Sequence, residues 1–180
     1  YFIGRYEESN ATGSNLENFK AATKVSTGYR TETDGSMSYT EGTLWNWITQ
    51  LGASKAAINT YKDSESVKSD LMNSYAWDTA IVYIQECGKA NYANQDGESI
   101  NSNLTNTGTG QDEVCKINDM ASNIVEWTTE YSSSTSSSNA YPCTYRGGDY
   151  YGSLDYTAYR GSNNATDSND SMGFRLSLYM

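Results

Sequence analysis

Residues 119–128 read DMASNIVEWT, and the run continues as TEY to Tyr131. From Asn123 to Tyr131 the sequence is rich in β-branched and aromatic side chains, which favour extended backbone. We therefore expect a strand over these residues, with Trp127 in the core. Working outward from this strand, the rest of the last third of the chain also reads as β-structure.

Three further segments have strand patterns. Residues Phe174–Tyr179 alternate apolar and polar side chains, the two-residue period of a half-buried strand, and we assign Phe174 to the core. Cys143–Arg146 predicts another strand, which Gly147-Gly148 ends. Tyr1–Glu7 is short, aromatic and β-branched, and predicts a strand at the start of the chain.

Helical patterns are fewer. Ser74–Glu86 is the best helix, because its apolar residues recur at three- and four-residue spacing and Gly88 follows its end. Ser54–Lys62 is a modest helix candidate, and a short helix is possible around Leu16–Lys20. Residues 89–112 predict a long surface loop, and residues 132–138 form a serine-rich connection. Together these elements predict one α+β domain over residues 1–180.

Composition and charge exclude several functions. The chain has 22 acidic and 12 basic residues, a net charge of -10 that repels phosphate backbones and anionic lipids. We expect no nucleic-acid partner and no membrane insertion. The sequence has no histidine, which excludes a histidine base, a Ser-His-Asp triad and a His-ligated zinc.

The three cysteines, Cys87, Cys115 and Cys143, show no C-x-x-C spacing. A zinc or redox motif is therefore not expected. One disulfide with one free thiol and three buried thiols both remain open. The carboxylate pairs Asp112/Glu113 and Asp167/Asp170 are expected to be solvated charges.

The segment Asp149–Ser171, DYYGSLDYTAYRGSNNATDSNDS, has the most distinctive composition. Tyr, Ser, Asp, Asn and Gly supply 17 of its 23 residues, and it has no Lys or Glu. It is too polar to bury much apolar area. An ordinary solvated loop is one interpretation. The other is a ligand-binding surface, in which tyrosines give rigid contact area and small polar residues give adaptable hydrogen bonds.

We predict ligand contacts from four tyrosines and eight small polar residues of this segment. The tyrosines are Tyr150, Tyr151, Tyr156 and Tyr159, and the polar residues are Ser153, Asp155, Ser162, Asn163, Asn164, Asp167, Asn169 and Asp170. The aspartates favour basic or polyhydroxyl partners. Arg146 and Arg175 are expected to be scaffold residues that pair with carboxylates or strand ends.

The order DMASNIVEWT, Arg146-Gly-Gly148, Arg160 and Gly173-Phe-Arg175 resembles the family of formylglycine-generating (sulfatase-modifying) enzymes. Tyr1–Glu7 looks like the opening strand of that family, and Tyr75-Ala-Trp-Asp78 is similar to its E-W-E helix start; residues 20–70 are not placed. The resemblance implies a C-type lectin-like fold of the formylglycine-generating-enzyme subtype, with a twisted antiparallel core.

The family's oxidase activity depends on a cysteine pair between R-G-G and G-F-R, and this segment has no cysteine. We therefore expect no catalytic residue, no metal and no cofactor. The family also binds calcium through the loop that corresponds to Asp119–Glu126. Here Ser122 replaces the usual glycine, so a purely structural turn is the preferred interpretation.

The chain resembles more closely a non-catalytic branch, the variable proteins of diversity-generating retroelements. Their last stretch is rewritten by mutagenesis at adenines, which produces the residue types found in Asp149–Ser171. The resemblance implies a monomeric domain, outside the cell or on a cell or virion surface, that binds a surface protein or glycan. The alternatives are a formylglycine-generating-type oxidase and an invariant surface adhesion domain.

Overall fold

The computed structural model describes residues 1–12, 17–29, 41–132, 142–152 and 156–180. Within them the strands form four sheets. The first sheet has the spatial order β1 (Phe2–Ile3), β13 (Leu176–Tyr179) and β6 (Lys68–Leu71), and the second has the order β11 (Arg160–Asn163), β10 (Cys143–Arg146), β9 (Val125–Tyr131) and β12 (Met172–Phe174). The third has the order β3 (Lys20–Ala22), β2 (Ser9–Thr12), β5 (Thr43–Leu44) and β4 (Gly28–Tyr29). The fourth is the hairpin of β7 (Glu113–Val114) and β8 (Ile117–Asn118).

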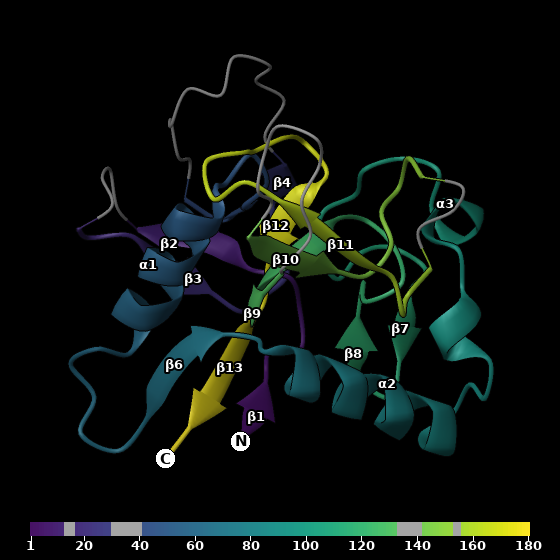
Figure 1. Ribbon diagram of the computed structural model, residues 1–180, viewed down its shortest axis with the longest axis horizontal. Coiled ribbons are helices and arrows are strands. Elements are labelled where there is room, and N and C mark those ends of the chain that lie inside the picture. Colours follow the sequence, from purple (N-terminus) through teal and green to yellow (C-terminus); the bar gives the residue numbers. More distant parts are fainter. Residues whose placement is uncertain (13–16, 30–40, 133–141, 153–155) are drawn as a thin grey trace.

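Two longer helices pack beside these sheets (Figure 1). Helix α1 (Gln50–Thr60) begins four residues earlier than predicted, because the Thr49 side chain caps it by accepting from the N–H of Gly52. Helix α2 (Ser74–Cys87) confirms the predicted helix, with Asn73 as its N-cap. The predicted loop 89–112 also contains a 3₁₀ turn, η1 (Tyr92–Asn94), and the short helix α3 (Gly97–Ile100).

Strand β9 organises the sheet that carries the C-terminal elements. It pairs antiparallel with β10 and parallel with β12, in the register Phe174 opposite Trp127. Both side chains are fully buried, which confirms their assignment to the core. The parallel β9–β12 pair is an exception to the antiparallel core that the resemblance implies.

The predicted single strand over Phe174–Tyr179 is wrong. The backbone switches sheets at Arg175, so that β12 joins β9 and β13 joins β1 and β6. Ser177, on the polar face of the alternating pattern, is buried, and Arg175 is buried in the carboxylate pairing expected of a scaffold residue. The physical reason is that both faces of this segment are covered, one by the core and the other by the polar residues that bind Arg175.

Two other predictions change near the N-terminus. The predicted strand Tyr1–Glu7 contains strand backbone only at β1, and Glu7 is buried. The possible helix around residues 16–20 is wrong for residues 17–20, where a turn leads into β3; Leu16 lies outside the described residues.

The core has two parts. One surrounds Trp45, Trp127 and Phe174 and is closed by the alanine face of α1. The other lies under α2 and includes Trp77 and Tyr92.

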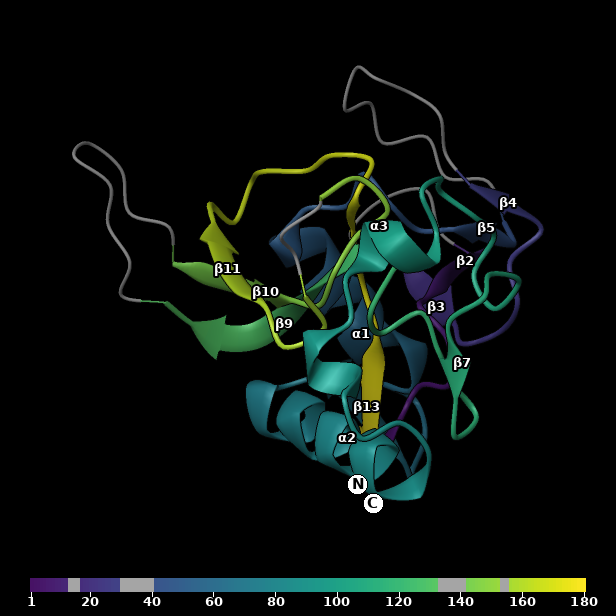
Figure 2. The same cartoon turned by 90° about the vertical axis from the view of Figure 1, so that its right-hand side faces the viewer.

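Both termini lie at one end of the molecule, and much of the chain between β10 and β12 lies at the other end (Figures 1 and 2). Among the described residues, no helix has the length and apolar character needed to cross a membrane.

Candidate functional site

The predicted binding segment lies between β10 and β12 and contains the edge strand β11, which pairs antiparallel with β10. We call its described residues, 149–152 and 156–171, the candidate surface. Ser153 and Asp155 lie outside the described residues, so their predicted role stays a prediction.

Tyr150 and Tyr151 form one aromatic group on the candidate surface. Their ring centroids are 6.3 Å apart, and Tyr151 is 81% exposed. Tyr150 is half-buried, and its hydroxyl donates to Oδ2 of Asp170 at 2.8 Å. Partial burial, followed by this hydrogen bond, raises the pKa of the Tyr150 hydroxyl above its ordinary value. Tyr151 is thus available for contact, while Tyr150 is held by its neighbours.

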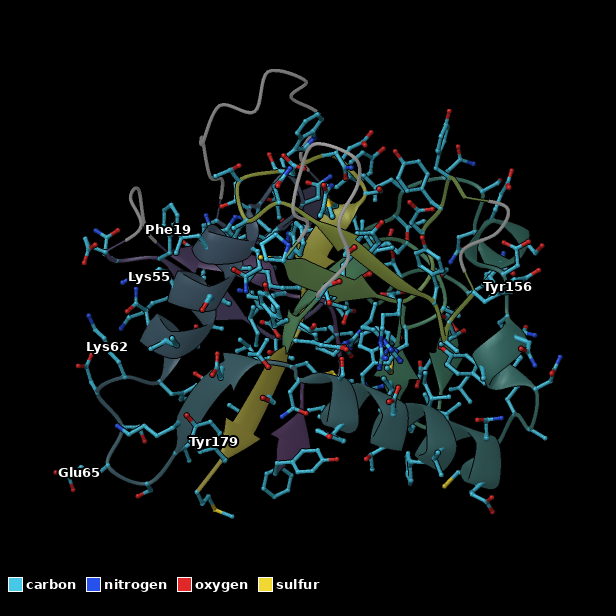
Figure 3. All side chains as sticks on the ribbon, in the orientation of Figure 1. Phe19, Lys55, Lys62, Glu65, Tyr156 and Tyr179 are labelled. Carbon is cyan, nitrogen blue, oxygen red and sulfur yellow. The ribbon has the colours of Figure 1, made fainter. Side chains whose placement is uncertain are left out.

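Tyr156 and Tyr159 differ in the same way. Tyr156 is 43% exposed and lies at the periphery of the molecule (Figure 3), with its backbone bridged to Asp96. Tyr159 is half-buried and packs on Tyr145, which in turn packs edge-on against Trp127. Tyr159 therefore connects the candidate surface to the core, and Tyr156 is the more accessible ring.

Asn169 and Asp170 are exposed, and hydrogen bonds to their main-chain oxygens fix the backbone at these two positions. The Asn169 oxygen accepts from the N–H of Trp47 at 2.9 Å, and the Asp170 oxygen accepts from the side-chain amide of Asn46 at 2.8 Å. The sequence did not predict this support, because Asn46 and Trp47 lie more than a hundred positions away. Asp170 also accepts from the Tyr150 hydroxyl through its carboxylate, so Asn46 and Tyr150 both bind this residue.

The other polar residues lie on and after β11. Ser162 pairs with Thr144 across the strand, Asn163 ends the strand, and both are half-buried. Asn164 donates through its side-chain amide to Oδ2 of Asp167 at 3.3 Å. Two of these four predicted contact residues therefore lie on the edge strand β11, and the other two lie in the turn that follows it.

A buried turn supports the start of the candidate surface. Asp149 is only 7% exposed, and its Oδ1 accepts from the N–H groups of Tyr151 and Gly152. A Cβ on Gly97 would lie 2.6 Å from the main-chain oxygen of Ala121 and would also overlap that of Asp149. Asp149 is therefore a support, and Gly97 is needed for the close approach of α3.

Residues 156–158 rest on the long loop that follows α2. Thr157 and Ala158 donate their N–H groups to the main-chain oxygens of Gln95 and Ala93, each at 3.0 Å. Thr157 is fully buried. The loop predicted from residues 89–112 is thus a structural base for the candidate surface.

Arg146 and Arg160 both approach Asp78, a residue of α2. Arg146 is nearly buried and pairs with Asp78, and Arg160 approaches Asp78 at 3.8 Å and Glu130 at 3.3 Å. Burial lowers the pKa of Arg146, and the carboxylate of Asp78 opposes this effect. The scaffold assignment of Arg146 agrees with this pairing. A cavity of about 400 Å³ beside these residues is lined in part by Ser74, Tyr75 and Glu130.

Arg175 occupies the centre of a buried polar network. Its guanidinium donates to both oxygens of Glu126 at 2.7–3.2 Å and to the main-chain oxygens of Gly4 and Asn118. Burial lowers the pKa of Arg175, but the carboxylates, Glu126 first, raise it above its ordinary value. Arg175 is therefore a scaffold residue that ties the first, middle and last parts of the chain together.

The Asp119–Glu126 loop does not fit a calcium ion as its residues stand. Both oxygens of Glu126 accept from Arg175, and Oδ2 of Asp119 accepts from the N–H of Gly108 at 2.7 Å. Asp119 and Asn123 have positive φ angles, as in a tight turn. In the part of the chain that the structure describes, no group of three Cys, Asp or Glu side chains is placed to hold a metal ion.

The oxidase chemistry of the resembled family does not fit the candidate surface either. Copper in that chemistry is held by a soft thiolate pair, and residues 147–172 contain no cysteine. Cys143 lies at the start of β10, half-buried against the core.

The fold and the site define an α+β domain of the C-type lectin-like class, in which a small sheet supports an irregular polar surface. Residues 49–178 match the family described as "Sulfatase-modifying factor enzyme 1-like domain", and the chain belongs to this family. The family includes enzymes. No curated protein matches the sequence.

Solved structures also match this chain at low sequence identity. The structure titled "Crystal Structure of CarF" has a TM-score of 0.52 and 16% identity, over 73% of this chain and 65% of that chain. The "Treponema denticola variable protein 1" has a TM-score of 0.43 and 19% identity, over 61% of this chain and 47% of that chain. The chain thus spans about half the length of the Treponema protein and about two thirds of CarF.

Proposed function

We propose that this domain binds a ligand through the candidate surface, as a variable protein of a diversity-generating retroelement does. In this proposal the residues of Asp149–Ser171 differ between copies of the gene while the backbone keeps its course. The tyrosines and small polar residues supply the contacts, and the domain is not an enzyme.

One observation carries the proposal: the candidate surface is anchored mostly through its main chain. The N–H of Tyr150 donates to the main-chain oxygen of Asn123, and the N–H of Thr157 donates to that of Gln95. The main-chain oxygens of Asn169 and Asp170 act as acceptors. Main-chain bonds are present whatever side chain a residue carries, apart from the constraints of Pro. Apart from Asp149 and Tyr159, whose side chains support the segment, side chains here can therefore be exchanged with little loss of scaffold bonds. The Arg175 network would tolerate no such exchange.

The chemistry of the surface favours a basic or polyhydroxylated partner. Exposed aromatic rings stack on sugar faces and on apolar side chains, and the carboxylates of Asp167 and Asp170 accept from ammonium, guanidinium or hydroxyl groups. The net charge of -10 steers basic partners toward the domain. We therefore propose a surface protein or a glycan as ligand, bound by a monomer outside the cell or on a cell or virion surface.

Sequencing tests this proposal directly. Copies of the gene from a population of cells or virions should differ mainly within codons 149–171, at adenines of a nearby template repeat that accompanies a reverse transcriptase gene. Codons for Arg146, Arg160 and Arg175 should stay constant. Substitutions spread evenly along the chain, with no template repeat, would show an invariant adhesion domain instead.

Membership of a family that includes enzymes makes the oxidase the second candidate. Its test is turnover of a cysteine-containing peptide with added copper and oxygen. We expect no aldehyde product, because the candidate surface lacks the thiolate pair. Turnover that is lost in Cys143→Ser would contradict the proposal.

A further inference from the structure

The end of helix α2 and the tip of the β7–β8 hairpin bring two cysteines together. Cys87 is the last residue of α2, and Cys115 is the first residue of the turn between β7 and β8. Sγ of Cys115 lies 3.2 Å from where a Cβ on Gly88, the residue after Cys87, would be. Burial, followed by the neighbouring Cys87, raises the pKa of the Cys115 thiol. Cys87 is exposed and Cys115 is half-buried. The two thiols are therefore adjacent and accessible.

The hairpin turn makes the cysteine at position 115 notable. Cys115 and Lys116 have φ angles of 53° and 67°, the backbone of a type I′ turn. Glycine and asparagine fit this turn best, because positive φ crowds a Cβ. Turn formation alone therefore does not explain a cysteine that contacts the end of α2.

We propose that Cys87 and Cys115 form a disulfide, and that Cys143 remains a free thiol. This inference concerns residues outside the candidate surface and does not depend on the proposed ligand. The third cysteine, at the start of β10, packs against the Trp127 core instead.

The bond forms by exchange with a small disulfide oxidant such as oxidised glutathione. The exposed Cys87 thiolate attacks one sulfur of the oxidant, which forms a mixed disulfide and releases one glutathione thiol. The Cys115 thiolate then attacks Sγ of Cys87 and releases the second glutathione thiol. The two cysteines lose two electrons and two protons, and the oxidant gains both. Such a bond persists in oxidising compartments.

The bond would close the loop that supports the candidate surface. Residues 93–96 lie between the two cysteines in sequence, and they hold residues 156–158 by main-chain contacts. The β7–β8 hairpin is an isolated two-stranded sheet, a kind that is marginally stable alone. A covalent link to α2 would fasten both the hairpin and the loop.

Trypsin separates the three cysteines, because cleavage after Lys68, Lys89, Lys116 and Arg146 places them in peptides 69–89, 90–116 and 117–146. The native protein is equilibrated in a glutathione redox buffer, alkylated, digested without reduction and analysed by mass spectrometry. We expect peptides 69–89 and 90–116 to be joined, with the loss of two hydrogen atoms, and peptide 117–146 to be alkylated. A cross-link to peptide 117–146, or glutathione adducts without any cross-link, would overturn the proposal.

Two variants complete the test. Cys143→Ser should form the same cross-link, and its oxidised form should melt roughly 6–12 °C above its reduced form. Cys87→Ser should form no cross-link, and its Tm should not respond to the redox buffer. A Cys143→Ser protein whose Tm is equal in both states would mean that the bond does not stabilise the loop, and would overturn the proposed tether.

Discussion

The guanidinium of Arg175 and the carboxylate of Glu126 form a completely buried ion pair, with Nη2 2.7 Å from Oε1 and Nε 3.1–3.2 Å from the two carboxylate oxygens. The pair sits where the chain passes from β12 to β13, and the same guanidinium reaches the main chain at Gly4 and Asn118. One side chain therefore links segments that are 171 positions apart.

Removing one partner of this pair should be strongly destabilising. Arg175→Met leaves the Glu126 carboxylate buried without its cation, and we expect a loss of about 3–5 kcal/mol in the free energy of unfolding, measured by urea denaturation. Arg5→Met is the control, because the Arg5–Glu113 pair is roughly half exposed and should cost less than about 1 kcal/mol. Equal losses in the two variants would contradict the central role of Arg175.

Glu8 should make stability depend on pH. It is fully buried, its Oε1 accepts from Thr23 and from the N–H of Leu176, and Oε2 has no hydrogen-bond partner among the described residues. Burial raises the pKa of Glu8 from 4.5 to about 7. Between these values the folded protein holds a proton that the unfolded chain has released, so stability falls as pH rises, by up to about 1.4 kcal/mol per pH unit.

The test of this pH dependence is Glu8→Gln, which keeps the acceptor and removes the titrating proton. The free energy of unfolding should fall less steeply between pH 4.5 and 7 than in the wild type, and the variant should be at least as stable at pH 8. Asp119, whose pKa burial raises to about 6, should retain part of the slope. The exposed Glu65 (Figure 3) supplies the control Glu65→Gln. Identical profiles for Glu8→Gln and the wild type would show that Glu8 does not titrate in this range.

Exposed tyrosines of the candidate surface should affect binding without affecting stability. Once a ligand is found on arrays of glycans and extracellular protein domains, Tyr151→Ala and Tyr156→Ala should each weaken binding about tenfold or more. Their Tm should change by less than about 2 °C, because both rings are exposed. Tyr179→Ala is the matched control, since Tyr179 is also partly exposed but lies at the other end of the molecule (Figure 3). Equal binding losses in all three would show that the ligand does not use this surface.

Tyr159→Ala should behave differently from those two variants. Its ring packs on Tyr145 at 6.1 Å and through it on Trp127, so its removal leaves a partly filled space at the edge of the core. We expect a loss of about 1–3 kcal/mol in unfolding free energy, measured by denaturation. A variant with unchanged stability would place Tyr159 among the contact residues only.

Gly97 should be required for the position of the turn at Asp149. A methyl group at this position would overlap the main-chain oxygens of Asp149 and Ala121, and backbone atoms cannot move aside cheaply. Gly97→Ala should therefore cost about 1–3 kcal/mol in unfolding free energy. The control is Gly28→Ala, where the nearest atom is 3.8 Å from the added Cβ, and denaturation of both variants gives the comparison. Equal stability of the two would contradict the close approach.

Local patterns in the sequence were enough to predict α2, β10, the whole of β9, and the core positions of Trp127 and Phe174. Each follows from strand formers, helical spacing or a capping residue within a few positions of the element itself. Composition alone also marked the segment Asp149–Ser171, since a polar, tyrosine-rich run with a single large aliphatic residue, Leu154, must lie largely at the surface. The interpretation of Asp112 as a solvated charge was wrong, because Tyr92 and the N–H of Ala121 bind it in the interior.

Only the tertiary structure decided which residues of that segment face solvent and which support it. Tyr151 and Tyr156 are exposed, whereas Asp149 and Tyr159 are held by residues distant in sequence. The same is true of Arg175, which the sequence indicates as a scaffold residue that pairs with carboxylates or strand ends. Its actual partners come from the first and middle parts of the chain, and only the structure identifies them. The periodicity of the sequence predicts only the face of the strand on which a side chain lies. Which residues contact that face depends on the packing of segments that are far apart in the chain.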